Sequence, residues 1–390
     1  MTIIVTGGDG YIGWPAALRI ANRTDERVVL VDNFARREWV EEVGSVSATP
    51  VYGIEERIAA AGETLGVDNL SFVEGDLVER SVVDELLAVH EPSAIVHAAA
   101  QPSAPYSGIN GERANYTQHN NLQSTRNLLW GLEAADLTDT HFIETTTTGV
   151  YGAPAFPIPE GGATMENQGE RDEVPFPAMA GSWYHLTKSH DAANMRLAHS
   201  QFGIPVSDVR TAITYGTEVE ETREDDRLKT RFDFDYYFGT VAHRFCAQAV
   251  AGYPVTVYGR GEQRKPFVSL PDAVEGLANL ALADPDERPS PLTVYNQVTR
   301  AISIVEVAET IAEVGDEFGL DVAVEHFENP RDEDETHKME IENDRYDALI
   351  GGQSVDFEAG VRDIFETLTR DDDVIAAHED RFLPGVLAED

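Results

Sequence analysis

Tyr184 and Lys188 are the residues whose types and spacing most directly indicate chemistry in this sequence. They stand four residues apart in a segment expected to be helical, so both side chains project from one face, one turn apart. An ammonium group beside a phenol favours the phenolate, so the tyrosine can accept a proton from a hydroxyl group as a hydride leaves. The alternative is a surface pair, which the same spacing gives in many helices. The chain has only four lysines among 29 basic residues, which favours the catalytic interpretation of position 188.

A run of threonines supplies a second chemical group. Residues 145–148 are all threonine, and they follow a predicted strand at the edge of an open sheet where ligands bind. A hydroxyl group there can complete a hydrogen-bond network around the reacting oxygen. Threonine also favours strands, so the run has a purely structural interpretation unless Tyr184 and Lys188 lie beside it.

The N-terminal segment predicts a dinucleotide site. Gly7, Gly10 and Gly13 lie between a predicted strand and a predicted helix, where glycines allow a tight turn and close approach to a pyrophosphate. Asp32 ends the next strand, where a carboxylate accepts hydrogen bonds from the ribose hydroxyls of NAD and repels a 2′-phosphate. As alternatives, Asp32 could be a helix cap, and the neighbouring Arg36 and Arg37 leave room for NADP.

The elements that must position these groups alternate between strands and helices. Strands are expected at 2–5, 28–32, 70–73, 94–97, 141–145 and 205–209, with helices at 11–22, 80–89, 112–135 and 184–202. This alternation predicts an α/β fold of the Rossmann type, with a doubly wound parallel sheet. The long connection at 41–66 is expected to carry its own helix.

The second half is less regular and predicts a smaller α/β substrate-binding lobe. Helices are expected near 239–251, 271–283 and 304–318, and a strand, turn and strand near 254–269. We therefore expect an NAD-binding domain over 1–216, with part of the lobe inserted near 155–180. Residues 217–390 would form mainly the nucleotide-sugar-binding lobe, with returns to the first domain.

The composition is strongly acidic. The formal net charge is −41, yet 42% of the residues are hydrophobic, which favours a folded protein adapted to concentrated salt over a disordered acidic tail. Such a charge argues against nucleic acids and anionic membranes as partners. The single cysteine, Cys246, excludes an intrachain disulfide and a cysteine-cluster metal site, and we expect no metal. We see no signal peptide and no long apolar run, and we expect a cytoplasmic protein without membrane insertion.

Together, the glycine-rich turn, the threonine before VYG and the YxxxK pattern resemble the extended short-chain dehydrogenase/reductase family that acts on nucleotide sugars. Further segments narrow the resemblance to its UDP-sulfoquinovose synthase branch and extend it over nearly the whole chain. These segments are GGDGYIGW (7–14), VDNFARR (31–37), QPSAPYS (101–107), YTQHNN (116–121), YHLTKSHD (184–191), FGT and HRFC (238–246) and NPR (329–331).

The resemblance implies conversion of UDP-glucose and sulfite into UDP-sulfoquinovose through a 4-keto sugar, with NAD as cofactor and a homodimer formed by the helices at 112–135 and 184–202. It assigns catalysis to Tyr184, Lys188, Thr147 and His185, although a histidine beside Tyr184 could also be a packed structural ring. The implied cofactor residues are Gly7, Gly10, Tyr11, Ile12, Gly13, Asp32, Asn33, Arg36, Asp76, Leu77, Ala98 and Lys188. The implied substrate residues are Gln101, Ser103, Thr147, Tyr184, Arg264, Lys265 and Arg331.

Three positions depart from that pattern. Ala100 and Pro102 replace a glutamate and an arginine on either side of Gln101, and Val150 replaces a glutamate. The oxidoreductase core is intact, whereas the residues for elimination and sulfite addition are less complete. This leaves a UDP-sugar 4-epimerase or a dehydratase as the alternative enzyme, and a non-catalytic NAD-binding regulator as a minor alternative.

Overall fold

The computed structural model describes residues 1–390 except 177–178, 285–291, 329–337, 371 and 385–390. Its centre is a seven-stranded sheet in the order β3, β2, β1, β4, β5, β8, β12, and every neighbouring pair is parallel. The strands are β1 (Thr2–Thr6), β2 (Arg27–Asp32), β3 (Leu70–Glu74), β4 (Ala94–His97), β5 (His141–Thr147), β8 (Val206–Thr211) and β12 (Leu292–Gln297). The order reverses between β1 and β4, so a crevice opens there at the carboxyl ends of the strands. The predicted doubly wound fold is confirmed.

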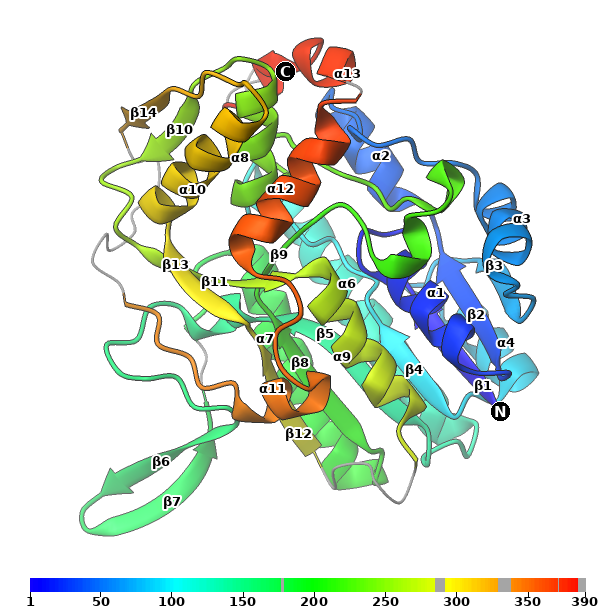
Figure 1. Ribbon diagram of the computed structural model, residues 1–390. Helices are drawn as coiled ribbons and strands as arrows, with labels where there is room; N and C mark the ends of the chain where they lie inside the picture. The colour runs from blue at the N-terminus through cyan, green and yellow to red at the C-terminus, as the bar shows by residue number, and fades with distance from the viewer. Residues whose placement is uncertain (177–178, 285–291, 329–337, 371, 385–390) are drawn as a thin grey trace.

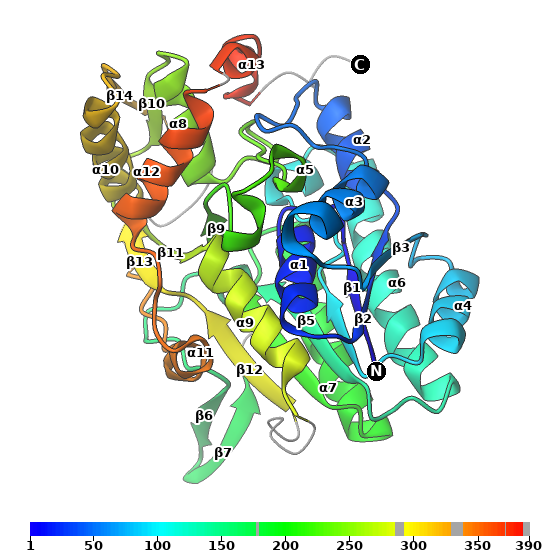
Figure 2. The same cartoon turned by 45° about the vertical axis from the view of Figure 1, so that its right-hand side comes forward.

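Helices cover both faces of this sheet (Figures 1 and 2). A separate hydrophobic core lies between each face of the sheet and its helices. The side chains of β1 alternate between these cores: Ile3 and Val5 pack on one face and Ile4 on the other. The first side holds α1 (Gly13–Arg23), α3 (Ile54–Leu65) and α9 (Leu270–Leu282), and the second holds α4 (Arg80–His90), α6 (Gly111–Ala134) and α7 (Trp183–Phe202). Because α9 and β12 come from the second half of the chain, the sheet layer is completed by residues far from its start.

The connection between β2 and β3 carries two helices, α2 (Ala35–Glu42) and α3. The helix predicted within 41–66 is therefore confirmed. Gly66 ends α3 in a left-handed conformation with φ of 71°, a usual way for a helix to stop.

A second lobe packs beside the carboxyl edge of the sheet and has its own core of aromatic and aliphatic side chains. Its helices are α8 (Val241–Val250), α10 (Ile304–Glu317), α12 (Phe357–Leu368) and α13 (Asp372–Ala376). Two small sheets accompany them, one of β10 (Val255–Tyr258) and β14 (Val324–Phe327), the other of β13 (Arg300–Ser303), β11 (Arg264–Ser269) and β9 (Ile213–Tyr215). The strands predicted within 254–269 form, but β10 and β11 join different sheets instead of pairing.

Residues 152–176 leave the sheet layer and include an exposed hairpin of β6 (Gly162–Asn167) and β7 (Glu170–Pro175), which projects from the body in Figure 1. Its base is anchored by Glu160, whose carboxylate accepts hydrogen bonds from the backbone N–H groups of Asn296 and Arg345 at 2.9 and 2.7 Å. Arg345 is the second residue of α11 (Asp344–Ile350). This anchor ties the loop after β5 to the last strand of the sheet.

Among the described residues, no helix combines the length and the apolar composition needed to cross a membrane.

Candidate active site

A cavity of about 1590 Å³ lies between the carboxyl edge of the sheet and the second lobe. Every residue assigned to the cofactor from the sequence lines it, from the glycine-rich loop to Lys188. The same cavity is lined by Thr147, Tyr184 and His185, and by Arg244 and Lys265 of the second lobe. One space therefore joins the predicted cofactor loop to the predicted chemical groups.

The glycine-rich loop leaves no room for side chains. Gly7 has a φ of 73°, and a Cβ atom on it would lie 2.8 Å from the backbone of Ala98. A Cβ atom on Gly13 would lie only 2.0 Å from the carbonyl oxygen of Gly7, because α1 begins directly under the turn. Such a bare backbone turn at a helix N-terminus fits the pyrophosphate of NAD.

Asp32 lies at the end of β2, on the wall of the same cavity. Its carboxylate is held by the backbone, accepting hydrogen bonds from Asp9 N–H at 2.9 Å and Phe34 N–H at 2.7 Å. Burial and the nearby charge of Asp9 raise the pKa of Asp32 above its ordinary value. A carboxylate fixed in this way fits the ribose hydroxyls of NAD.

The two arginines that left room for NADP are engaged with acidic residues of the chain. Arg37 forms two hydrogen bonds to the carboxylate of Asp9, both 2.7 Å long. Arg36 lines the cavity, but its guanidinium binds Asp233 at 2.7 Å and lies 4.1 Å above the ring of Phe238. The arginines thus shape the loop around the cofactor end, and this arrangement fits NAD.

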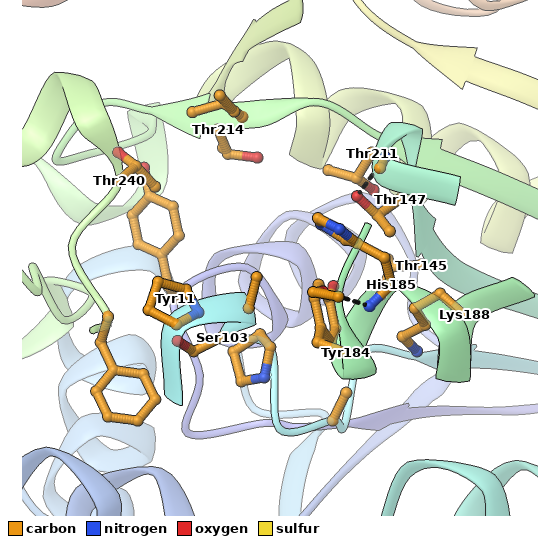
Figure 3. Close-up of a pocket in the computed structure, with 18 of the residues that line it drawn as sticks. Tyr11, Ser103, Thr145, Thr147, Tyr184, His185, Lys188, Thr211, Thr214 and Thr240 are labelled. Atoms are coloured by element: carbon orange, nitrogen blue, oxygen red, sulfur yellow. Dashed lines mark hydrogen bonds between the residues drawn. The ribbon is translucent and has the colours of Figure 1, made fainter. Parts of the chain in front are cut away.

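Helix α7 presents the chemical groups. Ser182 caps its first turn by accepting a hydrogen bond from the backbone N–H of His185 at 3.0 Å. Tyr184, His185 and Lys188 follow in the first turns, and all three line the cavity. Figure 3 shows them grouped with Thr147 on one side of the cavity.

Lys188 is fully buried and lies between two carboxyl groups that sequence reasoning missed. Its ammonium nitrogen is 3.1 Å from Glu144 Oε1 on β5 and 3.6 Å from Asp191 Oδ2 on α7. Burial opposes the charge, but Glu144 and Asp191 outweigh it and hold the pKa of Lys188 above its ordinary value. Lys188 therefore remains an ammonium ion.

These acids change the expected effect of Lys188 on Tyr184. The ammonium does lower the pKa of Tyr184, but burial outweighs it, and the charges of Asp191 and Glu144 also raise this pKa. The net pKa of the phenol is raised, contrary to the simple prediction from the YxxxK spacing. A lysine at helical spacing lowers the pKa of a tyrosine only to the extent that its own counterions allow.

Thr147 and His185 meet through Gly149, which lies in the short helix η1 (Thr148–Tyr151). The Thr147 hydroxyl oxygen accepts a hydrogen bond from Gly149 N–H at 3.1 Å. A Cβ atom on Gly149 would lie 2.3 Å from Cδ2 of the His185 ring. The imidazole of His185 thus packs directly against the backbone at Gly149, next to Thr147. Only glycine at position 149 leaves space for this ring.

The predicted substrate residues divide into two groups. Ser103 and Lys265 line the cavity, as do Thr147 and Tyr184. Gln101 does not: it is fully buried, and its side chain accepts from Ser103 N–H at 3.0 Å. Arg264 does not line the cavity either, and its guanidinium binds Glu306 on α10 at 3.0 Å.

Arg331 lies outside the described residues. Of the three departures, Ala100 and Pro102 line the cavity, whereas Val150 is buried in a small apolar cluster with Tyr151. These positions supply no charged group to the cavity.

Three residues at the site were missed from the sequence: Glu144, Asp191 and Arg244. An acidic residue directly after Phe142 and Ile143 in a predicted central strand was a signal for Glu144. The three-residue spacing from Lys188 was a signal for Asp191. Arg244 stands in the HRFC segment, and its guanidinium carbon lies 5.9 Å from the centre of the Tyr236 ring.

Comparison with known proteins places this site in a family. The NAD dependent epimerase/dehydratase family matches residues 3–296. The UDP-sulfoquinovose synthase of Sulfolobus acidocaldarius is 41% identical over 339 residues, which are 86% of this chain and 84% of that protein. The chloroplastic UDP-sulfoquinovose synthase of Spinacia oleracea is 36% identical over 86% of this chain and 68% of its own length.

Solved structures agree in fold. The UDP-glucose 4-epimerase of Thermotoga maritima, crystallised with UDP-glucose, superposes with a TM-score of 0.68 at 19% identity, covering 95% of this chain and 99% of its own. Its low identity supports the fold alone. The family match and the two synthases carry the assignment: this chain belongs to the NAD dependent epimerase/dehydratase family, and within it resembles the UDP-sulfoquinovose synthases.

Proposed function

We propose that the protein converts UDP-glucose, sulfite and a proton into UDP-sulfoquinovose and water. The observation that carries the proposal is the 41% identity to a UDP-sulfoquinovose synthase over 86% of the chain. The geometry supports it, because Thr147, Tyr184, His185 and Lys188 line the cavity that also contains the glycine-rich loop.

In this proposal, the glycine-rich loop and Asp32 would hold NAD, which would supply the acceptor and donor of the hydride at carbon 4 of the glucose. Tyr184 accepts the proton of the 4-hydroxyl group, and Thr147 hydrogen-bonds to that oxygen. Once carbon 4 is a ketone, the proton on carbon 5 is acidic, and this proposal assigns its removal to His185, which lines the cavity. Water leaves from carbon 6, sulfite forms a bond to that carbon, a proton returns to carbon 5, and Tyr184 returns its proton to the oxygen on carbon 4.

The nucleotide end of the substrate is assigned to the second lobe. Lys265 on β11 and Arg244 on α8 line the cavity opposite the glycine-rich loop. Both cations suit the diphosphate, Lys265 as a point charge and Arg244 with its planar fork of donors. Lys265 replaces Arg264 as the principal diphosphate ligand in this proposal, because Arg264 binds Glu306.

A UDP-sugar 4-epimerase remains the alternative, because it needs only Thr147, Tyr184 and Lys188. Incubation with UDP-glucose in concentrated salt, with and without sulfite, separates the two activities by mass spectrometry of the products. A sulfonated nucleotide sugar formed only with sulfite supports the synthase. UDP-galactose formed without sulfite would overturn it in favour of the epimerase.

We also propose a homodimer formed by α6 and α7, in a protein adapted to high salt. Trp130 and Leu197 are 52% and 55% exposed, and both line a shallow depression between these two helices. Large exposed apolar side chains of this kind mark interaction surfaces. Analytical ultracentrifugation in concentrated salt should give a dimer, and Trp130→Glu should give a monomer. A monomeric wild-type protein would contradict this proposal.

A further inference from the structure

Two carboxyl groups share the buried space behind the cavity. Glu144 and Asp191 are both fully buried, and they reach Lys188 from different elements, β5 and α7. Both carboxyl groups approach the same ammonium nitrogen, Glu144 at 3.1 Å and Asp191 at 3.6 Å, so two acids share one cation. Among the described residues, neither oxygen of Asp191 accepts a regular hydrogen bond. An ionised Asp191 would therefore be poorly solvated by the protein.

The remaining neighbours do not supply a second positive charge. His97 on β4 bonds to Thr6 and Thr125, and burial together with the charge of Lys188 lowers its pKa well below the ordinary value, so it is neutral. Asp208 on β8 is held by Arg210 at 3.0 Å. Tyr184, the other titratable group that acts on this space, becomes negative when it ionises.

Charge neutrality then fixes the number of protons. Lys188 carries one positive charge, so two ionised acids would leave a net negative charge buried without a partner, which is strongly unfavourable. With one proton on the pair, the cluster is neutral, and Lys188 keeps the carboxylate of Glu144 at 3.1 Å. Asp191 is the more distant acid, at 3.6 Å from the ammonium nitrogen, and its oxygens accept no hydrogen bond from the described residues. Burial first, and then the charge of Glu144, raise the pKa of Asp191 well above its ordinary value, so the proton belongs on Asp191.

We propose that Glu144 and Asp191 form a one-proton acid pair, which holds Lys188 and sets the pH at which Tyr184 becomes a base. Glu144 and Asp191 are positioning residues here, because they act on Tyr184 through Lys188 and through their charge. Either acid can supply the single negative charge that Lys188 requires. Only the loss of both exposes Tyr184 to the full effect of the ammonium. The effect on catalysis rests on the proposed function, whereas the proton count does not.

The proton itself is measured without substrate. Infrared spectroscopy at pH 8 should show a protonated carboxyl band in the wild type that is missing in Asp191→Asn. The band should also be missing in Glu144→Gln, because Asp191 then ionises to pair with Lys188. A band that persists in Glu144→Gln, or that is absent from the wild type, would overturn the proposal.

Unfolding gives a second measure of the same proton. The folded chain keeps a proton that the unfolded chain releases above about pH 4, so the contribution of Asp191 to stability is lost as pH rises. Relative to Asp191→Asn, the unfolding equilibrium constant of the wild type should rise by about tenfold per pH unit between pH 5 and 7. Parallel pH dependences of the two proteins would contradict the assignment.

The catalytic consequence is tested by the pH dependence of the reduction of bound NAD by UDP-glucose. The one negative charge of the pair raises the pKa of Tyr184, so removal of both acids should lower this pKa. Each single variant should move the acid limb of this profile by less than about half a pH unit, and Glu144→Gln/Asp191→Asn should move it down by at least about one unit. Equal additive shifts would overturn the effect on Tyr184.

If the double variant does not fold, the infrared band and the unfolding slope decide. A missing reaction with UDP-glucose, together with the expected band, would reject the proposed function but not the acid pair.

Discussion

The two ends of the cavity use cations in different ways. At the cofactor end, Arg36 and Arg37 are bound to Asp233 and Asp9, and the ligand faces a glycine turn and one carboxylate. At the opposite end, Lys265 and Arg244 line the cavity itself.

The different placement of the cations at the two ends explains how a chain with a net charge of −41 could bind a diphosphate sugar. Arginines at the cofactor end stabilise the shape of the loop, where backbone N–H groups suffice for the pyrophosphate. In the proposed function, the cations that line the substrate end attract the diphosphate against the negative field of the whole protein. Tyr184 and His185, to which the proposed function assigns the chemistry, line the same cavity.

The largest effect is expected where the two ends meet. Tyr184→Phe removes the proton acceptor for the 4-hydroxyl group, so turnover should fall by about 10² to 10⁴-fold. The phenylalanine ring keeps the packing of the tyrosine, so NAD should remain bound. The amount of bound NAD is measured from the absorbance or fluorescence of the purified variant. A variant with full activity would show that Tyr184 is not the base.

The second prediction concerns the position of the His185 ring, which packs against Gly149. Gly149→Ala places a methyl group within 2.3 Å of the imidazole, which must move. We expect overall conversion to sulfonated product to fall by about a hundredfold, while reduction of bound NAD by UDP-glucose changes by less than about fivefold. Gly111→Ala is the control, because open space surrounds that position. An equal loss in both steps would indicate general damage to the site rather than displacement of His185.

The cofactor end is tested by Asp32→Ser. Loss of a charged hydrogen-bond acceptor should weaken NAD binding by about ten- to a hundredfold. NADP should not bind in its place, since Arg36 and Arg37 are engaged with Asp233 and Asp9. Calorimetry with both dinucleotides measures the change. Tight NADP binding by the variant would show that one of the two arginines is available.

The smallest effect compares two neighbours at the substrate end. Lys265→Ala should raise the KM for UDP-glucose by about tenfold, through loss of a charged contact to the diphosphate. Arg264→Ala should leave KM unchanged and lower the free energy of unfolding by about 0.2 to 1 kcal/mol, as expected for a partly exposed ion pair. A raised KM in Arg264→Ala and an unchanged KM in Lys265→Ala would instead assign the diphosphate contact to Arg264.

The cofactor end could be predicted from the sequence because its determinants are local. The spacing of Gly7, Gly10 and Gly13 after a buried strand already specifies the turn, and the strand that follows ends at Asp32. The order of strands and helices gave the doubly wound sheet for the same reason.

The substrate end depends on packing between distant segments. Arg264 and Lys265 are adjacent on β11, so they face opposite sides, and the pairing of β11 with β9 and β13 decides which one faces the cavity. No local pattern specifies that pairing. The contact of Glu144 with Lys188 likewise depends on how α7 packs against β5.

The most direct test of the proposed function follows the absorbance of the reduced cofactor in the protein loaded with NAD in concentrated salt. Addition of UDP-glucose alone should raise the absorbance near 340 nm to roughly one equivalent per site, because the loss of water from carbon 6 follows the oxidation and draws it forward. Sulfite should then return the absorbance to its starting value as the sulfonated sugar forms. Steady conversion of UDP-glucose to UDP-galactose, with no response to sulfite, would contradict the account.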